Sequence, residues 1–564
     1  MSCRRCERLR VVNVALVFLA CLAADGASAA EGGLRAVSPA DGAEVPLLNE
    51  AQKAFLDMPL EISRVKFDEP VFRTNLVRSC GHFPLNVVLA WTNDTSAPCE
   101  VSVASLPDGR PVRPMRVDAF SATCGNLEVG RTYEWVVTCG GEAVTNRFTT
   151  ENRAPRLIRD PNVPNVRDVG GWTGLGGRRI RQGRIFRSAG LNDNASEAYT
   201  TREEVLAADT DGSVARREAE LLAEEKRLKR KNASLPVVEV ALSGPWTCER
   251  ADGRVESIEP DERHGVWISG AQSEKAVLKK TFQAEADGYA VFGCGGDWYW
   301  KMAVNGVVEI DRMKGNNRDT VSADNFIVVC PVRKGENTIE TKLTAGSAGF
   351  VFYCTALTEK PARAASLRVK SAARLRAAIF RQPKGFVTGR SRITGENRRM
   401  WLSDFGLKSD IDLRSDRECY GMTGSPLGPS VAWFHYSGKC YEPFVNTQGG
   451  RESFARVFRV MLEEKNYPVD FHCIAGQDRT GSVSFVLLAL LGADDTALYH
   501  DWAVTGFFNP ESNWFNYKKR FCAMCREFER FGGADMRLNA EAYVKKCGFT
   551  DDDIARFRAL MLED

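Results

Sequence analysis

The 564-residue sequence has no block of basic residues and almost no net charge, since 76 lysines and arginines stand against 73 aspartates and glutamates. Clustered positive charge supplies most of the affinity of a protein for nucleic acid, so we expect no nucleic-acid partner. Long apolar runs are also scarce. After the N-terminal segment none reaches the roughly 20 residues that a membrane-spanning helix requires, so we expect no transmembrane span.

Residues 1–30 have the order of a secretory signal peptide. Four arginines precede the apolar run 11–24, and the small residues at 27–29 then offer a cleavage site. Cys21 follows a poor version of a lipoprotein cleavage box, so lipid anchoring is not expected. The sequence predicts an exported protein, periplasmic or secreted, in which disulfides are permitted.

Cysteine pairs with metal-site spacing are almost absent. Outside the signal region the only CxxC lies at 522–525 and has no second pair, so we expect buried thiols on a helix and no zinc. Cys80, Cys99, Cys124 and Cys139 fall in one N-terminal region and could pair, although spacing alone does not fix the connectivity. No metal or other cofactor is expected.

Residues 34–152 contain short alternating apolar runs, a pattern that predicts a β-sandwich. Strands are expected at 86–92, 100–104, 132–138 and 144–149. Trp91 and the Leu127…Tyr133-x-Trp135 arrangement resemble a fibronectin type III domain. We expect its aromatic side chains to be core and its role to be spacing or docking.

Residues 235–360 again have a sequence pattern typical of β-strands. The hairpin sequence at 304–306 (VNG) and the turn sequence at 334–337 (KGEN) resemble the galactose-binding-like jelly roll found in many glycoside hydrolases. If the aromatic residues of this segment are exposed, they would stack on sugar rings. If they are buried, they are simply part of the domain core. Carbohydrate contact through the two β-sandwiches is therefore a further expectation.

Residues 196–234 read as a charged helical linker. Positions 209–218 partly fit a calcium-binding loop, but Ala207 stands where the first carboxylate ligand is needed. We expect a helix interrupted by a turn.

The most informative stretch is 469–481, VDFHCIAGQDRTG. A strand leads into Cys473, and the apolar run 483–491 after Arg479 predicts a helix, so the order is strand, tight loop, helix. Backbone N–H groups and the helix dipole favour an anion at such a helix start, where a cysteine also loses its proton easily. Arg479 adds a planar fork that fits phosphate oxygens. The stretch thus supplies a nucleophile, an anion cradle and a fixed charge.

Three separated blocks resemble the bacterial tyrosine/serine phosphatase family (IphP-like), a branch of the cysteine-dependent tyrosine phosphatases. They are NVRDVGG at 165–171 with GRIFRS at 183–188, DLRS at 412–415, and the cysteine loop. The gap between the first two blocks is far too long, which predicts a domain inserted within the phosphatase domain.

The fold class that follows is multidomain. We expect an α/β phosphatase domain with a central, mainly parallel sheet flanked by helices, together with the two β-sandwiches. Its predicted parts are the signal peptide 1–30, the sandwich 34–152, the phosphatase segments 155–195 and 374–564, the linker 196–234 and the inserted sandwich 235–360.

The resemblance implies hydrolysis through a phosphocysteine without a metal. Cys473 attacks phosphorus, and Thr480 eases departure of the sulfur by hydrogen bonding. Phosphate is held by the Arg479 side chain and by backbone N–H groups of Ile474, Ala475, Gly476, Gln477, Asp478 and Arg479. His472 is expected to orient the loop.

A general acid must protonate the leaving oxygen. Asp412 and Asp478 rank together as candidates, ahead of Asp168, and the alternative for Asp412 is a structural salt bridge to Arg414 or Arg479. The first and second blocks are expected to form walls of the site. The supporting residues predicted are His472, Asp168, Arg167 and Arg414.

Gln477 stands where the resembled family usually has lysine, which lowers the expectation of polyanionic lipid substrates. The sequence therefore predicts an exported protein tyrosine (or dual-specificity) phosphatase, acting on a phosphorylated protein or small phosphomonoester. One alternative is an inositol-polyphosphate or phosphoinositide phosphatase. Another is a glycan-binding protein with a vestigial phosphatase domain.

Overall fold

The computed structural model describes residues 33–564, apart from residues 67, 80–83, 95–96, 262–264, 269–273, 298, 314–320, 346–349, 382 and 509–513. The predicted signal peptide and Cys80 lie outside the described residues. The chain forms two compact units. One comprises the residues up to Ser196 together with Val387–Asp564, and the other is Glu197–Phe386.

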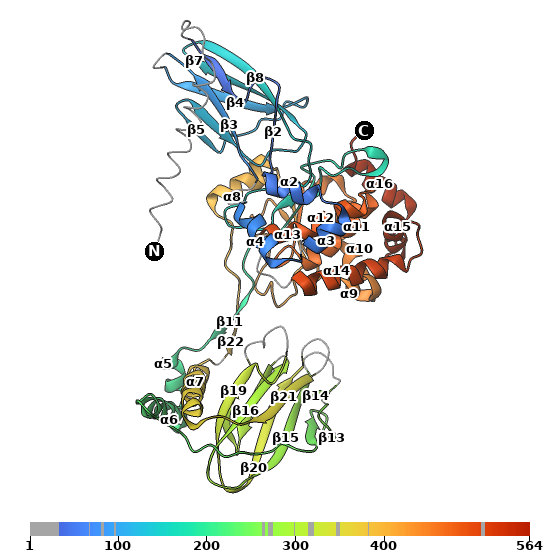
Figure 1. Ribbon diagram of the computed structural model, residues 1–564. Helices are drawn as coiled ribbons and strands as arrows, with labels where there is room; N and C mark the ends of the chain where they lie inside the picture. Colours follow the sequence, from blue (N-terminus) through green and yellow to red (C-terminus); the bar gives the residue numbers. More distant parts are fainter. Residues whose placement is uncertain are drawn as a thin grey trace. The chain divides into compact units, whose positions relative to one another are not determined.

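The N-terminal part of the first unit contains two four-stranded sheets (Figure 1). One has the order β1 (Arg35–Ser38), β3 (Val87–Thr92), β6 (Ser121–Cys124), β5 (Arg116–Asp118). The other has the order β2 (Ala43–Val45), β8 (Glu142–Thr150), β7 (Thr132–Cys139), β4 (Cys99–Ser105). All four predicted strands are present. Trp91 and Trp135, one from each sheet, are buried with ring centroids 6.5 Å apart, so these aromatic residues are core.

Cys99 and Cys139 form a disulfide between β4 and β7, whereas Cys124 is a free, buried thiol.

Three helices interrupt this N-terminal region, and the sequence pattern did not predict them. They are α2 (Glu50–Leu56), α3 (Leu60–Lys66) and α4 (Pro70–Ser79). The capping box of α2 joins the Asn49 and Gln52 side chains to each other's backbone N–H. Phe55 of α2 is fully buried, and its ring centroid lies 5.8 Å from that of Phe507. These helices therefore complete the core of the part of the unit that contains the segments expected to form a phosphatase domain, named the phosphatase part below.

The phosphatase part is built on a five-stranded sheet of order β24 (Ala432–His435), β23 (Ser409–Asp412), β25 (Val469–His472), β10 (Ile185–Ser188), β9 (Arg167–Asp168). The first four strands are parallel, and only β9 is antiparallel. The expected mainly parallel sheet is thus present, assembled from both sides of the insertion. Asp412 and Ser188 flank His472 in register, which brings all three blocks together at the end of β25.

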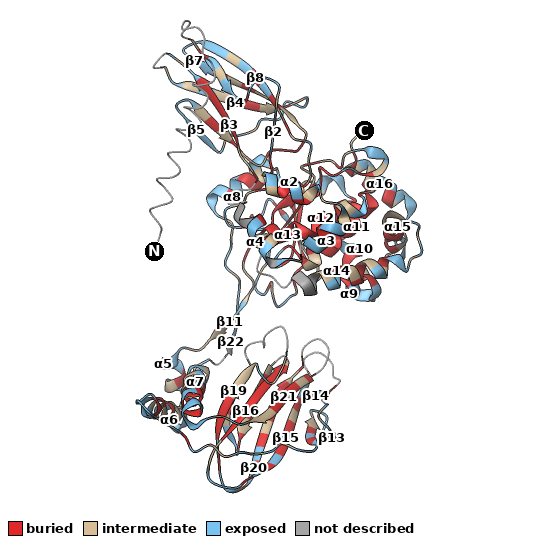
Figure 2. Ribbon diagram, viewed as in Figure 1, coloured by how far each residue is buried: buried red, intermediate tan, exposed pale blue. Residues whose placement is uncertain are grey.

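Side chains alternate across this sheet. One face, including Ile411 and Phe471, joins a large core with the C-terminal helices, and α11 is buried almost throughout (Figure 2). Helices of this part are α9 (Glu442–Asn446), α10 (Gln448–Met461), α11 (Asp478–Leu490), α12 (Asp495–Ala503), α13 (Thr505–Phe508), α14 (Trp514–Glu529), α15 (Met536–Lys546) and α16 (Asp551–Met561). The other face is capped by α8 (Gly395–Arg399) and a π-helical turn (Met400–Asp404), where Trp401 packs edge-on against Phe186. It also carries buried polar residues.

The second unit contains two antiparallel sheets around one apolar core. The six-stranded sheet has the order β13 (Val255–Ile258), β12 (Trp246–Arg250), β15 (Lys275–Ala284), β20 (Gly335–Thr344), β17 (Tyr299–Val304), β18 (Val307–Asp311). The four-stranded sheet has the order β14 (Gly265–Ile268), β21 (Phe350–Leu357), β16 (Gly288–Asp297), β19 (Phe326–Val332). Asn305 and Gly306 both have positive φ, as the tight β17–β18 hairpin requires.

This unit is wider than the 235–360 that the sequence suggested. The segment expected to be a linker forms β11 (Ser196–Tyr199), α5 (Arg202–Ala207) and α6 (Ser213–Leu228), and the chain continues after the sheets into α7 (Pro361–Ile379) and β22 (Pro383–Val387). Helix α7 packs on α6 and on the sheets, so both helices belong to the unit. The Asp209 carboxylate accepts hydrogen bonds from Val214 N and Ala215 N and thus caps α6.

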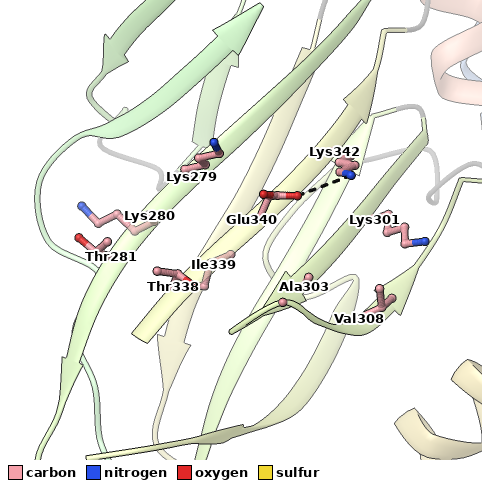
Figure 3. Close-up of a pocket in the computed structure, with 11 residues that line it drawn as sticks. Lys279, Lys280, Thr281, Lys301, Ala303, Val308, Thr338, Ile339, Glu340 and Lys342 are labelled. Atoms are coloured by element: carbon pink, nitrogen blue, oxygen red, sulfur yellow. Dashed lines mark ion pairs between the residues drawn. The ribbon is translucent and has the colours of Figure 1, made fainter. Parts of the chain in front are cut away.

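A hollow of about 550 Å³ lies on the six-stranded sheet of this unit (Figure 3). Lys279, Lys301 and Lys342 line it, together with Glu340, and the described lining contains no aromatic side chain. Trp246 and Trp300 are instead buried in the core of the unit.

Candidate active site

The loop between β25 and α11 places Cys473 directly after the central strand. The Cys473 side chain is 2% exposed at the base of the loop, and α11 starts five residues later at Asp478. Gly476 has φ +67°, and a Cβ added there would lie 2.5 Å from the Ser188 carbonyl oxygen. Glycine is therefore required both for the backbone conformation and for the close approach of β10.

Three successive carbonyl groups of this loop are turned back into the protein. The oxygens of residues 474–476 accept, in order, from Gly190 N (3.2 Å), Asn165 Nδ2 (2.8 Å) and Arg187 Nη2 (2.8 Å). The backbone N–H groups of residues 474–477 donate to no backbone acceptor among the described residues. The loop consequently keeps its N–H groups for an anion, at the positive end of a buried helix.

The surroundings of Cys473 favour its thiolate. Burial would raise the pKa of this thiol, but the Arg479 charge and hydrogen bonding from Thr480 outweigh it and lower the pKa below the ordinary value. Cys473 therefore has the electrostatic setting of a nucleophilic cysteine.

Arg479 is held in place by Glu418, a residue that the sequence analysis did not single out. Arg479 Nη1 and Nη2 donate to the two Glu418 carboxylate oxygens at 2.7 and 3.2 Å, and Nη1 also donates to Leu413 O at 3.2 Å. Glu418 in turn accepts from the Ser415 backbone N–H and hydroxyl. The Ser-x-x-Glu spacing after a strand is the signal that could have indicated this bracket.

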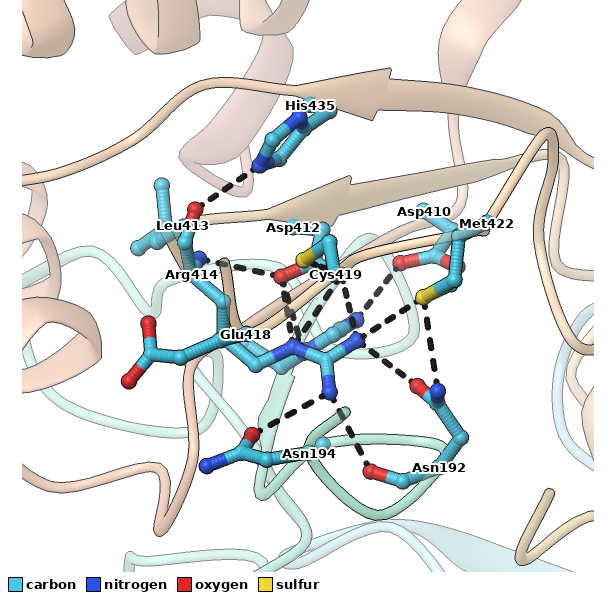
Figure 4. A network of polar contacts seen from close by, with 12 residues as sticks. Asn192, Asn194, Asp410, Asp412, Leu413, Arg414, Glu418, Cys419, Met422 and His435 are labelled. Carbon is cyan, nitrogen blue, oxygen red and sulfur yellow. Dashed lines mark hydrogen bonds and ion pairs between the residues drawn. The ribbon is translucent and has the colours of Figure 1, made fainter. Parts of the chain in front are cut away.

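Asp412 is not placed to act as a proton donor. Asp412 and Arg414 are both fully buried and form an ion pair of 2.6 Å, and Arg414 also donates to Asn192 (Figure 4). Burial would raise the pKa of Asp412, but His472 and Arg414 outweigh it, so the pKa is lowered and the carboxylate stays ionised. Of the two roles expected for Asp412, the structure supports the structural salt bridge to Arg414 and offers no geometry for a general acid.

Asp168 is also a structural residue. It is fully buried and accepts hydrogen bonds from Arg156 Nη1, Gly170 N and Gly183 N, so it fixes the turn between the halves of the first block. Asp478, in contrast, is half-buried at the start of α11. Of the three predicted candidates, Asp478 is the one that is not fully buried.

Arg167 supports the Cys473 loop through buried contacts and does not line a wall of the candidate active site. It is fully buried, donates to Asp501 through Nε at 3.1 Å and bonds Asn165. Arg187 donates to the other Asp501 oxygen. Asp501 thus joins two arginines that orient the loop. The sequence analysis missed this residue, because it lies in a helix far along the chain and no local pattern indicates its contact with the loop.

His472 and its neighbours form a buried polar cluster behind the loop. His472 Nε2 lies 3.0 Å from Asp410 Oδ1, and burial, which would lower the pKa of His472, is outweighed by Asp412 and Asp410, which raise it to about 9. A charged His472 therefore balances the carboxylates on this face of the sheet.

The Gln477 side chain is 3% exposed, so it does not project toward a substrate. The described residues contain no group of three or more His, Cys, Asp or Glu side chains that could hold a metal ion, and none of the described helices is long and apolar enough to cross a membrane.

Comparison with known proteins bears on this site. Residues 158–237 and 389–563 match the model of the tyrosine phosphatase family. A tyrosine-protein phosphatase from Nostoc commune is 28% identical over an alignment of 128 residues, and the match covers 19% of this chain and 43% of that protein. The chain thus spans less than half the length of this curated relative.

Solved structures resemble the chain only weakly. A β-glucosidase from Kluyveromyces marxianus has a TM-score of 0.18 at 12% identity, covering 21% of this chain and 16% of that one. An α-L-rhamnosidase from Dictyoglumus thermophilum has a TM-score of 0.12 at 12% identity, covering 48% and 25%. The likeness to the tyrosine phosphatase family rests on the two matched segments, the second of which contains the Cys473 loop.

Proposed function

We propose that this chain hydrolyses phosphate monoesters through a phosphocysteine intermediate. The observation that carries the proposal is the Cys473 loop, in which a thiol with a lowered pKa faces Arg479 and a row of free backbone N–H groups. The thiolate attacks phosphorus as the bond to the leaving oxygen breaks, and Arg479 with the loop N–H groups holds the three equatorial oxygens. Thr480 stabilises the sulfur as it leaves in the second step.

Asp478 is the proton donor in this proposal. Its carboxyl gives a proton to the leaving oxygen in the first step, and the resulting carboxylate then takes a proton from the water that attacks the phosphocysteine. Position and exposure support this assignment, since Asp412 and Asp168 are fully buried in structural contacts.

The test is turnover of para-nitrophenyl phosphate by the full chain, with vanadate as inhibitor. Cys473→Ser should abolish turnover, whereas Cys522→Ser, at a half-buried position on α14, is the matched control. Wild-type protein without turnover, or turnover that survives Cys473→Ser, would refute the enzymatic proposal and favour a binding protein.

Phosphorylated proteins are the substrate class we propose, with phosphotyrosine first. The buried Gln477 supplies no extra positive charge at the loop, whereas polyanionic substrates such as inositol polyphosphates call for one. Phosphotyrosine peptides, phosphoserine peptides, phosphoinositides and inositol hexakisphosphate should be compared by kcat/KM. A preference for either inositol class would overturn this choice.

Export to an oxidising compartment is part of the proposal. The order of residues 1–30 and the Cys99–Cys139 disulfide both support it. N-terminal sequencing of protein recovered from periplasm or medium should find the first 30 residues removed.

Carbohydrate contact is a second candidate function, favoured by Trp267 of β14, which is 59% exposed. An exposed indole is a stacking surface for sugar rings, and we propose such contact for this unit. A glycan array should show binding that Trp267→Ala removes, and silence of the wild-type protein on the array would end this proposal.

A further inference from the structure

Tyr441 is tied to Asp478 of the catalytic loop by two routes. Its phenol Oη donates to Asp478 Oδ1 at 2.6 Å. Its backbone N–H donates to Ser482 Oγ at 2.9 Å, and the Ser482 hydroxyl donates to Asp478 O at 2.9 Å. Residues 478 and 482 are one turn apart on α11, so the side chain and the backbone of Tyr441 both dock on the first turn of this helix.

The chain is strained to place this phenol. Tyr441 has φ +57° and ψ −133°. Residues other than glycine rarely adopt this backbone conformation, which costs on the order of 1–3 kcal/mol. The ring is 1% exposed in the core, and the Arg520 guanidinium lies 4.5 Å from its centroid. Such strain persists only where the surroundings fix the residue, and the fixed contact here is with Asp478.

The phenol is a permanent donor. Burial and the neighbouring Asp478 charge raise the pKa of Tyr441 well above its usual value, so the hydroxyl stays protonated throughout the working range of pH. Its hydrogen bond therefore occupies Asp478 Oδ1 in the free enzyme. Oδ2 of Asp478 accepts no hydrogen bond from a described residue.

We propose that Tyr441 is a positioning residue for the general acid and leaves Asp478 Oδ2 as the oxygen that carries the transferred proton. In the first step the Oδ2–H bond breaks and the proton goes to the leaving oxygen, while the sulfur–phosphorus bond forms and the phosphorus–oxygen bond breaks. Asp478 becomes a carboxylate, and the Tyr441 phenol stabilises it. The inference rests on the proposed function and adds a residue to it.

Comparing substrates with different leaving groups distinguishes a positioning role of Tyr441 from a merely structural one. Para-nitrophenolate leaves with little help, whereas phenolate requires protonation as it departs. In Tyr441→Phe the ratio of kcat for para-nitrophenyl phosphate to kcat for phenyl phosphate should rise about tenfold or more, with KM changing little. A residue that only supports the fold would lower kcat for both substrates by the same factor, and that result would overturn the proposal.

Tyr467→Phe is the matched control, because Tyr467 is an equally buried tyrosine of the same unit whose hydroxyl donates to a backbone carbonyl, that of Met461. Its substrate ratio should equal that of the wild type. Tyr441→Phe combined with Asp478→Asn should show the same ratio as Asp478→Asn alone, because the phenol acts through the carboxyl. If the effects of the two substitutions on the substrate ratio instead multiplied in the double variant, that result would contradict the inference.

If Tyr441→Phe does not fold, as circular dichroism would show, Ser482→Ala tests the same contact by removing the backbone anchor, and it should raise the same ratio. The failure of the two proposals is distinguishable. Wild-type protein inactive on both substrates refutes the proposed function, whereas active wild-type protein with an unchanged ratio in both variants refutes only the role of Tyr441.

Discussion

Asp470 makes the stability of the phosphatase part depend on pH. This carboxyl is fully buried on the polar face of the central sheet, where its Oδ2 accepts from the Ser188 hydroxyl at 2.8 Å and its strand neighbour in register is Asp410. Burial raises the pKa of Asp470, His472 counteracts this in part, and Asp410 adds to it, so the pKa is about 7 against an ordinary value of 3.8.

The sign follows from linkage. A carboxyl group whose pKa is raised in the folded state binds its proton more tightly there than in the unfolded chain. The folded state therefore loses stability as pH rises from about 4 to 7. With about 1.4 kcal/mol for each pKa unit, the full loss is about 4 kcal/mol, of which roughly 2.5 kcal/mol falls between pH 5 and pH 8. Asp470→Asn removes the charge but keeps an oxygen that can accept from Ser188.

The assay is thermal unfolding of the full chain at pH 5 and pH 8. Relative to the wild type, Asp470→Asn should gain about 2.5 kcal/mol of unfolding free energy at the higher pH, seen as a rise of a few degrees in the midpoint of the unit that contains it. Asp416→Asn changes a carboxylate that is 95% exposed in the same unit, and its midpoint should follow the wild type at both pH values. Parallel pH dependence of Asp470→Asn and wild type would refute the reasoning.

Three further outcomes follow from the geometry. Glu418→Gln should lower kcat/KM for para-nitrophenyl phosphate about tenfold, because the bidentate contact that orients Arg479 weakens, and unchanged kinetics would contradict this expectation. Gly476→Ala should lose about a hundredfold or more in kcat, since its Cβ meets a carbonyl oxygen at 2.5 Å, whereas Gly424→Ala, with no atom within 4 Å, should behave as wild type. Reduction of Cys99–Cys139, which spans 40 residues, should lower the unfolding free energy of the N-terminal sandwich by about 4 kcal/mol, measured by denaturant titration with and without reductant.

Local pattern was sufficient where the chain makes its structure from neighbouring residues. The strand, loop and helix around Cys473 lie where the apolar runs predicted them, and so do the four N-terminal strands. The long gap between the first and second family-like blocks also predicted an insertion, and Glu197–Phe386 forms a separate unit that matches this prediction in outline. For the strands, the loop and the helix, the signal was a periodicity or a spacing within about 20 residues.

Contacts between distant segments were not predictable in this way. Helices α2 to α4 lie within the region expected to be a sandwich, yet Phe55 packs against His500 and Phe507 of the phosphatase core. Asp501 orients Arg167 and Arg187 across more than 300 residues. Such partners are chosen by the tertiary fold, and single-sequence patterns carry no information about them.

The choice among the candidate acids, however, was partly readable in the sequence. In SDID at 409–412 and VDFH at 469–472, acidic or histidine residues alternate with Ile411 and Phe471. Because side chains in a strand alternate between faces, Asp412 must lie on the same face as Asp410, opposite the apolar core. A strand with carboxylates at every second position and a histidine in register beside them predicts a buried charge network, in which each carboxylate is retained by a partner. Asp478, which begins a helix after the loop, has no such neighbours, and its side chain is the one among the candidate acids that stays partly exposed.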